Sequence, residues 1–210
     1  MHKNAFEDLK IIKKVFEQHK VPFLLAYGTL LGAYRDKDFL PGDDDIDLVV
    51  VDNIDLRTRK AIGWMLYDLG FKNQQIMFNV FGRMEPGEQG YNGDGKTGII
   101  TCERNAKFTI FFFYEDDCET HGKEMVCIPK LGALKLISSP SKFYLAFQKI
   151  KFKGETFLTP APIEDYLAFT YEDWRNPLMR DHGKCFHELH PEYLTLMKNV
   201  LDKNEAIKFK

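Results

Sequence analysis

The chain has 210 residues, and its 29 basic and 31 acidic side chains give a formal net charge of −2, which excludes a general attraction to nucleic acid. Hydrophobic residues make up 44% of the chain, enough for one core. No apolar run reaches the roughly 20 residues that span a bilayer, and residues 1–10 are polar rather than a secretory segment. We therefore expect a single domain over residues 1–210 that is soluble and cytoplasmic.

The first third of the chain predicts a helix, a short strand and a second helix. Apolar residues at helical spacing predict an amphipathic helix over 4–19. Residues 23–27 are apolar and predict a buried strand, and a helix over 28–35 follows. At the junction, Gly28 allows a sharp exit from the strand because glycine tolerates positive φ. Thr29 is a residue type that caps helices.

This strand, Gly-Thr turn and helix start form an arrangement that binds phosphate. Free backbone amides and the helix dipole both favour an anion at such a place. Gly32 would let the helix lie close to another backbone. Arg35, one to two turns later, could reach a phosphate or pair with the acidic residues that follow. A Gly-Thr pair is also a common helix cap, so the motif alone does not define a site.

An acidic run follows, with four carboxylates in the five residues 43–47, and it leads directly into an apolar strand over 46–51. Adjacent carboxylates raise each other's pKa unless a cation shares the site. Alternation along the strand places Asp45 and Asp47 on one face and Ile46 on the other. Paired carboxylates suit Mg²⁺ or Mn²⁺ in phosphoryl chemistry. A solvated turn is the alternative, but the run enters a strand and follows the Gly-Thr motif.

The rest of the chain predicts further strands and helices. A helix over 55–69 would turn Ile62, Leu66 and Leu69 inward and end at Gly70. The glycine-containing segment 84–97 is either a lid or a plain hairpin connection. The other expected elements are an extended segment over 71–83, strands near 98–104, 107–114 and 124–128 with a turn at Asn105 and Ala106, a loop with a short helix over 128–143, and helices near 141–149, 163–170 and 191–207.

Two motifs in this order, GTLLGAYR at 28–35 and PGDDDIDL at 41–48, resemble the core of the LicD/fukutin-type family of the nucleotidyltransferase superfamily. Residues 107–117 resemble the family's later strand. Together with a C-terminal signature, the resemblance spans about 20–178. It implies an α/β (α+β) nucleotidyltransferase-like core, a small mixed β-sheet flanked by helices, with a helical C-terminal part. The C-terminal signature is resembled by Phe152, Gly154, Pro162, Glu164, Tyr166, Leu167, Tyr171, Trp174 and Pro177.

The resemblance also implies an activity. Family members use a metal to transfer a phospho-alditol or phosphocholine-like group from a CDP-linked donor to a hydroxyl of a glycan or lipid-linked glycan. By the same resemblance, Gly28 and Thr29 would seat the donor phosphates, and Arg35 would neutralise their charge. Asp45 and Asp47 would hold Mg²⁺ or Mn²⁺. Asp43 and Asp44 would assist the metal or orient the loop.

One departure concerns the third carboxylate that relatives carry in the later strand, where this chain has Thr109. In this superfamily that carboxylate completes the metal site or acts as a general base, which threonine cannot do near neutral pH. Another carboxylate could substitute, among them Asp43, Asp44 and Glu103, or the metal site could be reduced. The chain could also be a degenerate nucleotide- or glycan-binding protein. A third alternative is a nucleotidyltransferase that moves NMP to a sugar, protein or small acceptor.

The tail of the matched region offers possible substrate contacts. Tyr171 and Trp174 could stack on a sugar or base, and Arg175 could meet a phosphate, or the two rings could simply pack against the core. The four cysteines are expected to be reduced in a cytosolic chain. We do not expect zinc, because no spacing matches a zinc signature among the candidate ligands Cys118, Cys127, His121, Cys185, His182, His187 and His190.

Overall fold

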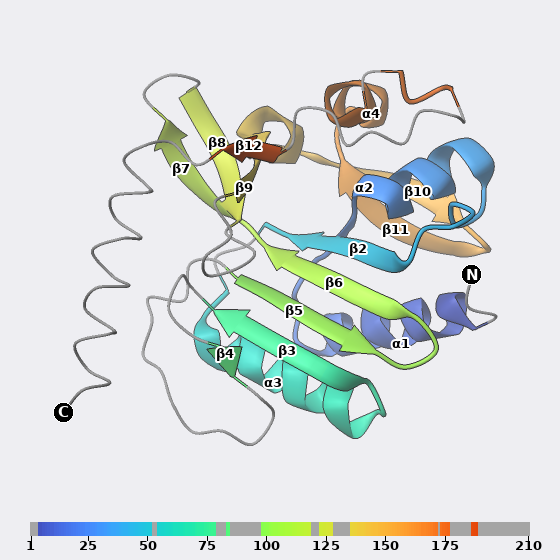
Figure 1. Cartoon of the computed structure of the whole chain (residues 1–210), viewed down its shortest axis with the longest axis vertical. Helices are drawn as coiled ribbons and strands as arrows, with labels where there is room; N and C mark the ends of the chain where they lie inside the picture. The colour runs from blue at the N-terminus through green and yellow to red at the C-terminus, as the bar shows by residue number, and fades with distance from the viewer. Residues whose placement is uncertain are drawn as a thin grey trace.

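The computed structural model describes residues 4–51, 54–78, 83–84, 98–118, 122–127, 135–171, 173–176 and 186–188. Within these residues the protein is a mixed α/β structure with two sheets (Figure 1). The larger sheet contains, in spatial order, β10 (Phe147–Phe152), β11 (Glu155–Pro160), β1 (Leu24–Leu25), β2 (Asp45–Val50), β6 (Lys107–Phe112), β5 (Gly98–Glu103), β3 (Lys72–Phe78) and β4 (Arg83–Met84). The smaller sheet contains β12 (Phe186–Glu188), β9 (Lys135–Pro140), β8 (Gly122–Cys127) and β7 (Tyr114–Cys118).

The larger sheet is mixed, as the family resemblance implies. Its central strands β2 and β6 run parallel, and β1 runs parallel to β11. The other paired neighbours run antiparallel. Apolar side chains of β2 and β6 are buried, which is typical of central strands covered on both faces.

Helices cover both sides of this sheet. Figure 1 shows α1 (Ala5–Gln18) and α3 (Leu56–Asp68) side by side, and these two helices are in contact. The short helix α2 (Tyr27–Leu31) lies against β2, and α4 (Ile163–Tyr171) contacts both α2 and β11. The expected helix over 4–19 is confirmed, with Leu9, Ile12 and Phe16 fully buried.

Helix α3 begins and ends as its sequence predicts. The Asp55 side chain accepts a 2.7 Å hydrogen bond from the Thr58 amide, which satisfies a free donor of the first turn. Gly70 follows the helix with a φ of +93°, a value that glycine adopts without strain. Ile62 is buried as predicted, but the prediction for Leu69 is wrong because this side chain is 45% exposed. Leu69 lies at the helix end, where the 3.6-residue period no longer decides which way a side chain points.

The predicted strand 23–27 and helix 28–35 exist in altered form. The strand is only β1, because the helix already begins at Tyr27. Helix α2 then continues as a π-helix, η1 (Gly32–Asp36). Within it, a Cβ on Gly32 would lie 2.5 Å from the Asp38 carbonyl oxygen and 2.9 Å from the Leu40 nitrogen. The prediction that Gly32 allows close approach of another backbone is therefore confirmed.

The predicted helix over 141–149 is wrong. Residues Ser141–Tyr144 form a short 3₁₀ turn, η2, and the chain then enters strand β10. Strands β10 and β11 form a hairpin whose two-residue turn, Lys153 and Gly154, has positive φ at both positions. This is the turn geometry that matches the twist of a hairpin. The alternation that buries Ile150 and Phe152 between exposed lysines decides for a strand.

Two further predictions need correction. The later strand, expected near 107–114, ends at Phe112, and the Phe113 amide donates a 2.8 Å hydrogen bond to the Val50 carbonyl. The chain then passes into β7 of the smaller sheet. Strand β9 lies where a loop was expected. Residues 85–97 of the expected loop and the expected helix over 191–207 lie outside the described residues.

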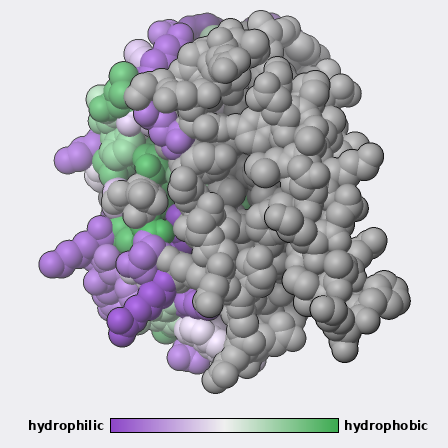
Figure 2. Space-filling model, turned by 90° about the vertical axis from the view of Figure 1, so that its left-hand side faces the viewer, coloured by the Kyte–Doolittle hydropathy of each residue, from purple (hydrophilic) through white to green (hydrophobic). Residues whose placement is uncertain are grey.

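Figure 2 shows one side of the molecule, where the described hydrophobic residues gather in a strip bordered by hydrophilic ones. Among the described residues, the large hydrophobic side chains that remain exposed are Trp64, Leu69, Leu145 and Phe147. In the described part of the chain, no helix has both the length and the apolar character needed to cross a membrane.

Candidate active site at the start of β2

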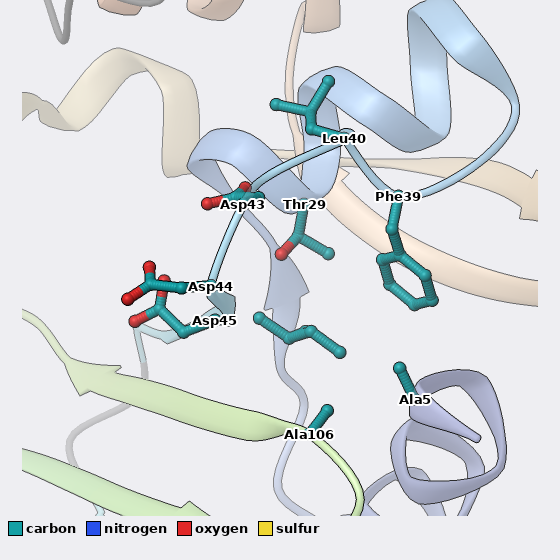
Figure 3. Close-up of a pocket in the computed structure, with 9 residues that line it drawn as sticks. Ala5, Thr29, Phe39, Leu40, Asp43, Asp44, Asp45 and Ala106 are labelled. Carbon is teal, nitrogen blue, oxygen red and sulfur yellow. The ribbon is translucent and has the colours of Figure 1, made fainter. Parts of the chain in front are cut away.

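Three consecutive carboxylates gather where the chain enters β2. One oxygen from each of Asp43, Asp44 and Asp45 lies within 4.8 Å of the others. Figure 3 shows these side chains pointing to one side of the loop, away from Phe39 and Ala5. Asp44 is exposed, and the other two are partly buried. Asp45 belongs both to this group and to the predicted pair, whereas Asp47 lies outside the group of three.

Helix α2 holds this loop from one side. The Asp47 amide donates a 2.8 Å hydrogen bond to Thr29 Oγ1. A Cβ on Gly28 would lie only 2.3 Å from Asp43 Oδ2, so this carboxylate occupies the space that a side chain would need. The Gly-Thr pair is thus in direct contact with the acidic run, which brings the two sequence motifs together.

Two details predicted for this turn are wrong. The positive φ, +45°, falls on Tyr27 rather than on Gly28. Thr29 does not cap the helix, because Ala26 is the N-cap residue and no side chain caps the first turn. Glycine is required at position 28 by the approach of Asp43, and Thr29 instead connects α2 with β2.

Strand β6 holds Asp45 from the other side. In the parallel register, Asp45 lies opposite Lys107 and Asp47 lies opposite Thr109. Thr109 Oγ1 donates a 2.8 Å hydrogen bond to Asp45 Oδ2, and Lys107 Nζ lies 3.6 Å from the same oxygen. Lys107 was not identified from the sequence as a residue of the site. Only the parallel pairing of β2 with β6, which places it opposite Asp45, shows that it belongs there.

The local electrostatics indicate an excess of negative charge. Burial, and then the charges of Asp45 and Asp43, raise the pKa of Asp47 well above its usual range. Lys107 lowers it, but does not cancel the effect. Oxygen ligands that repel one another in this way are the donor set that a hard divalent cation stabilises. The residues present therefore fit a cation such as Mg²⁺ or Mn²⁺.

A small cavity lies beside the loop, between Thr29, Leu40, Ala106 and the three carboxylates (Figure 3). Its volume is about 10 Å³, which admits about one water molecule. The cavity is too small for a nucleotide. A donor would have to meet the carboxylates from the side to which they point.

Arg35 is engaged away from the acidic loop. Its Nε and Nη2 atoms lie 2.7 and 2.9 Å from the two carboxylate oxygens of Asp36, and Nη1 donates to the Trp174 carbonyl at 3.0 Å. These contacts use three of the five N–H donors of the guanidinium. The structure thus gives Arg35 a role in fixing η1 to the tail after α4.

Of the possible substrate residues in that tail, Tyr171 and Trp174 are buried, whereas Arg175 is exposed. Tyr171 is buried, and Trp174 is 5% exposed with its ring 5.6 Å from the ring of Tyr34. Arg175 lies over Trp174, with 4.2 Å from Cζ to the ring centroid, and donates to Glu164 at 2.7 Å. Of the alternatives for Tyr171 and Trp174, packing against the core is the one observed.

The strand register does not bring together Cys118 and Cys127, two of the cysteines considered for zinc. Cys118 pairs with Gly122 at one end of the β7–β8 pair, whereas Cys127 follows the Tyr114–Val126 pair at the other end. Cys102, in β5, is buried, and burial raises the pKa of its thiol to about 12. The other candidate ligands, except His187 in β12, lie outside the described residues.

A mixed sheet covered by helices, with clustered carboxylates at the start of a central strand, defines an α/β protein of the nucleotidyltransferase type. Comparison with known families agrees with this class. The model of the family described as LicD/FKTN/FKRP, nucleotidyltransferase domain, matches residues 20–162. The chain belongs to this family, and it is a transferase by that membership.

Among solved structures, the lincosamide antibiotic adenylyltransferase LnuA with lincomycin bound has 15% identity and a TM-score of 0.44, covering 78% of this chain and 84% of that one. The antibiotic-resistance factor ANT(2″)-Ia in solution has 15% identity, coverages of 99% and 96% and a TM-score of 0.45. Its complex with adenylyl-2″-tobramycin has 15% identity, coverages of 97% and 92% and a TM-score of 0.40. Likenesses this distant assign no substrate. No curated protein matches the chain significantly.

Proposed function

We propose that the chain is a metal-dependent transferase that moves a phospho-alditol or phosphocholine-like group from a CDP-linked donor to a glycan or lipid-linked glycan hydroxyl. The observation that carries this proposal is the clustering of three carboxylates against the Gly-Thr turn at the start of β2. Family membership supplies the reaction class, and the residues supply a place where metal and phosphate can meet.

The metal would be held by carboxylates from the acidic loop. Asp45 and Asp47 are the proposed ligands from β2, and Asp43 and Asp44 bring further oxygens within reach. When bound, Mg²⁺ or Mn²⁺ would neutralise charge on the donor's phosphates. Because such reactions depend mainly on positioning and electrostatics, the chain needs little covalent machinery.

The donor phosphates would lie against Gly28 and Thr29. Thr29 Oγ1 accepts from the Asp47 amide, but Thr29 is 2% exposed and Asp43 lies against Gly28, so the Asp43 side chain would have to move aside for a phosphate to reach this turn. Arg35 was expected to neutralise phosphate charge. Its contacts with Asp36 and Trp174 support a positioning role for it instead.

A donor screen tests the proposal. Purified protein would receive CDP-ribitol, CDP-glycerol, CDP-choline or plain nucleoside triphosphates, each with Mg²⁺, Mn²⁺ or EDTA, and released CMP and pyrophosphate would be measured. Metal-dependent CMP release from one CDP donor supports the proposal and identifies the head group. Pyrophosphate release would favour NMP transfer, and nucleotide binding without turnover would favour a degenerate binding protein.

Two variants connect this chemistry to the acidic loop. Asp45→Ala and Asp47→Ala should each abolish metal-dependent CMP release, whereas Asp68→Asn, which changes an exposed carboxylate at the end of α3, should leave it unchanged. Full turnover in either alanine variant would contradict the assignment of the metal site.

A further inference from the structure

We infer that Thr109 is a positioning residue that fixes the orientation of Asp45 toward the cation, so the residue at the third-carboxylate position still serves the metal site without being a ligand or a base. This inference rests on the metal site of the proposed function. It concerns how one ligand is held and not which donor is used.

The first observation is that β6 engages a single oxygen of Asp45. Thr109 Oγ1 donates to Oδ2 at 2.8 Å, and Lys107 Nζ lies 3.6 Å from that same atom. Within the described residues, no hydrogen bond to Asp45 Oδ1 is found. The carboxylate is thus held through one oxygen, and the other remains for a metal ion.

The second observation is that the hydroxyl is in a fixed place. Thr109 is only 8% exposed, and it lies within the parallel pairing of β2 with β6. Its side chain is β-branched, which restricts χ1. A donor held in this way orients a metal ligand without adding charge, as partners of ligating carboxylates do in other metal sites.

The third observation explains why a neutral group suits this position. The acidic loop already carries four carboxylates, and the nearby cation Lys107 is 46% exposed, so solvent screens it. A carboxylate at position 109 would face Asp45 at the distance where Thr109 now donates a hydrogen bond. Threonine therefore keeps the position useful and avoids a further like-charge contact.

The test compares two substitutions of Thr109, one without the hydroxyl and one with it. Thr109→Val removes the hydroxyl and keeps the branched shape, whereas Thr109→Ser keeps the hydroxyl. Mn²⁺ affinity would be measured by electron paramagnetic resonance of the free ion, without nucleotide. Loss of the orienting partner should weaken Mn²⁺ binding about tenfold in Thr109→Val, and Thr109→Ser should stay within about twofold of the natural chain.

Substitution of Lys107 should change Mn²⁺ binding in the direction opposite to Thr109→Val. Lys107→Met removes a positive charge that opposes the metal ion and should tighten Mn²⁺ binding about threefold at low ionic strength, an effect that about 1 M salt removes. Lys107→Arg keeps the charge and should change little. The loss in Thr109→Val should persist at high salt, because it comes from a hydrogen bond.

Equal Mn²⁺ affinity in folded Thr109→Val and in the natural chain would overturn the inference, and so would the absence of Mn²⁺ binding in the natural chain. If Thr109→Val does not fold, Thr109→Ala removes the same hydroxyl with a smaller side chain and takes its place. The donor screen is a separate readout. Silence from all CDP donors, with the expected order of Mn²⁺ affinities, would refute the proposed function and leave this inference supported.

Discussion

A buried carboxylate on α1 anchors the turn that leads into β6. Asp8 is fully buried and accepts hydrogen bonds from the Asn105 amide at 2.7 Å, the Asn105 side chain at 2.8 Å and the Ala106 amide at 3.3 Å. Arg104 adds a 3.1 Å contact from its guanidinium. Lys107 follows this turn directly, so Asp8 fixes the start of the strand that holds Asp45.

We predict that Asp8→Ala lowers the free energy of unfolding by about 3–5 kcal/mol, because it removes the buried acceptor of two backbone amides and one side-chain amide. The Asn105 and Ala106 donors lose their acceptor, and each such loss costs about 1–3 kcal/mol when water cannot replace it. Arg104 is 38% exposed and contributes little, since solvent can take over its contact. For a chain of this length the midpoint temperature should fall by about 10 °C.

Chemical denaturation followed by tryptophan fluorescence measures this change. Asp8→Asn should lie between Ala and the natural residue, because an amide keeps one acceptor oxygen. Glu7→Ala is the matched control, since Glu7 is exposed, precedes Asp8 on the same helix and only pairs with Lys10. Its effect should stay within about 0.5 kcal/mol. If Asp8→Ala also stays within about 1 kcal/mol of the natural chain, the anchoring argument is refuted.

Three further predictions concern the loop and its supports. Gly28→Ala should weaken Mn²⁺ binding with little change in stability, because its Cβ would displace only the flexible end of Asp43; metal titration and thermal melting measure the two effects. Gly32→Ala should cost more stability than Gly154→Ala in a urea melt, since it meets backbone atoms at 2.5 and 2.9 Å, whereas the alanine at 154 suffers only the strain of positive φ, about 1–2 kcal/mol. In EDTA no metal ion balances Asp47, whose pKa is higher in the folded state than in the unfolded state, where it is about 4. The stability that this raised pKa contributes is present below the unfolded pKa and is lost as pH rises through the folded pKa. Asp47→Asn should therefore raise the melting temperature at neutral pH and have less effect near pH 4; an equal effect at both would contradict the assignment.

Local sequence patterns correctly predicted the helices and strands in which buried residues recur at a regular spacing or form one apolar run. The spacing of Leu9, Ile12 and Phe16 predicted α1 because a single face of that helix is buried. The apolar run after the acidic residues predicted β2 as a central strand. The close approach at Gly32 was also predictable, since a glycine inside a helix needs a packing reason.

Other features of the structure were predicted wrongly or were not predicted. The segment that forms β10 was assigned to a helix, although its alternation and the Lys153–Gly154 pair are typical of a hairpin. The π-helical turn of η1 has no periodic signature in five residues. Gly28 was interpreted through its backbone freedom, whereas the structure uses its missing side chain.

The site shows why a candidate metal ligand can be identified in a sequence, whereas the residues that hold it in place cannot. The acidic run is local and visible, but its partners come from distant elements. Thr29 reaches Asp47 across 18 positions, Thr109 reaches Asp45 across 64, and Asp8 reaches Asn105 across 97. The three contacts depend on the packing of α2 against β2, on the parallel pairing of β2 with β6 and on the packing of α1 against the turn between β5 and β6, and none of these follows from residue type. Thr109 therefore looks like a lost carboxylate in the sequence, and only the register that places its hydroxyl on Asp45 gives it a positive role.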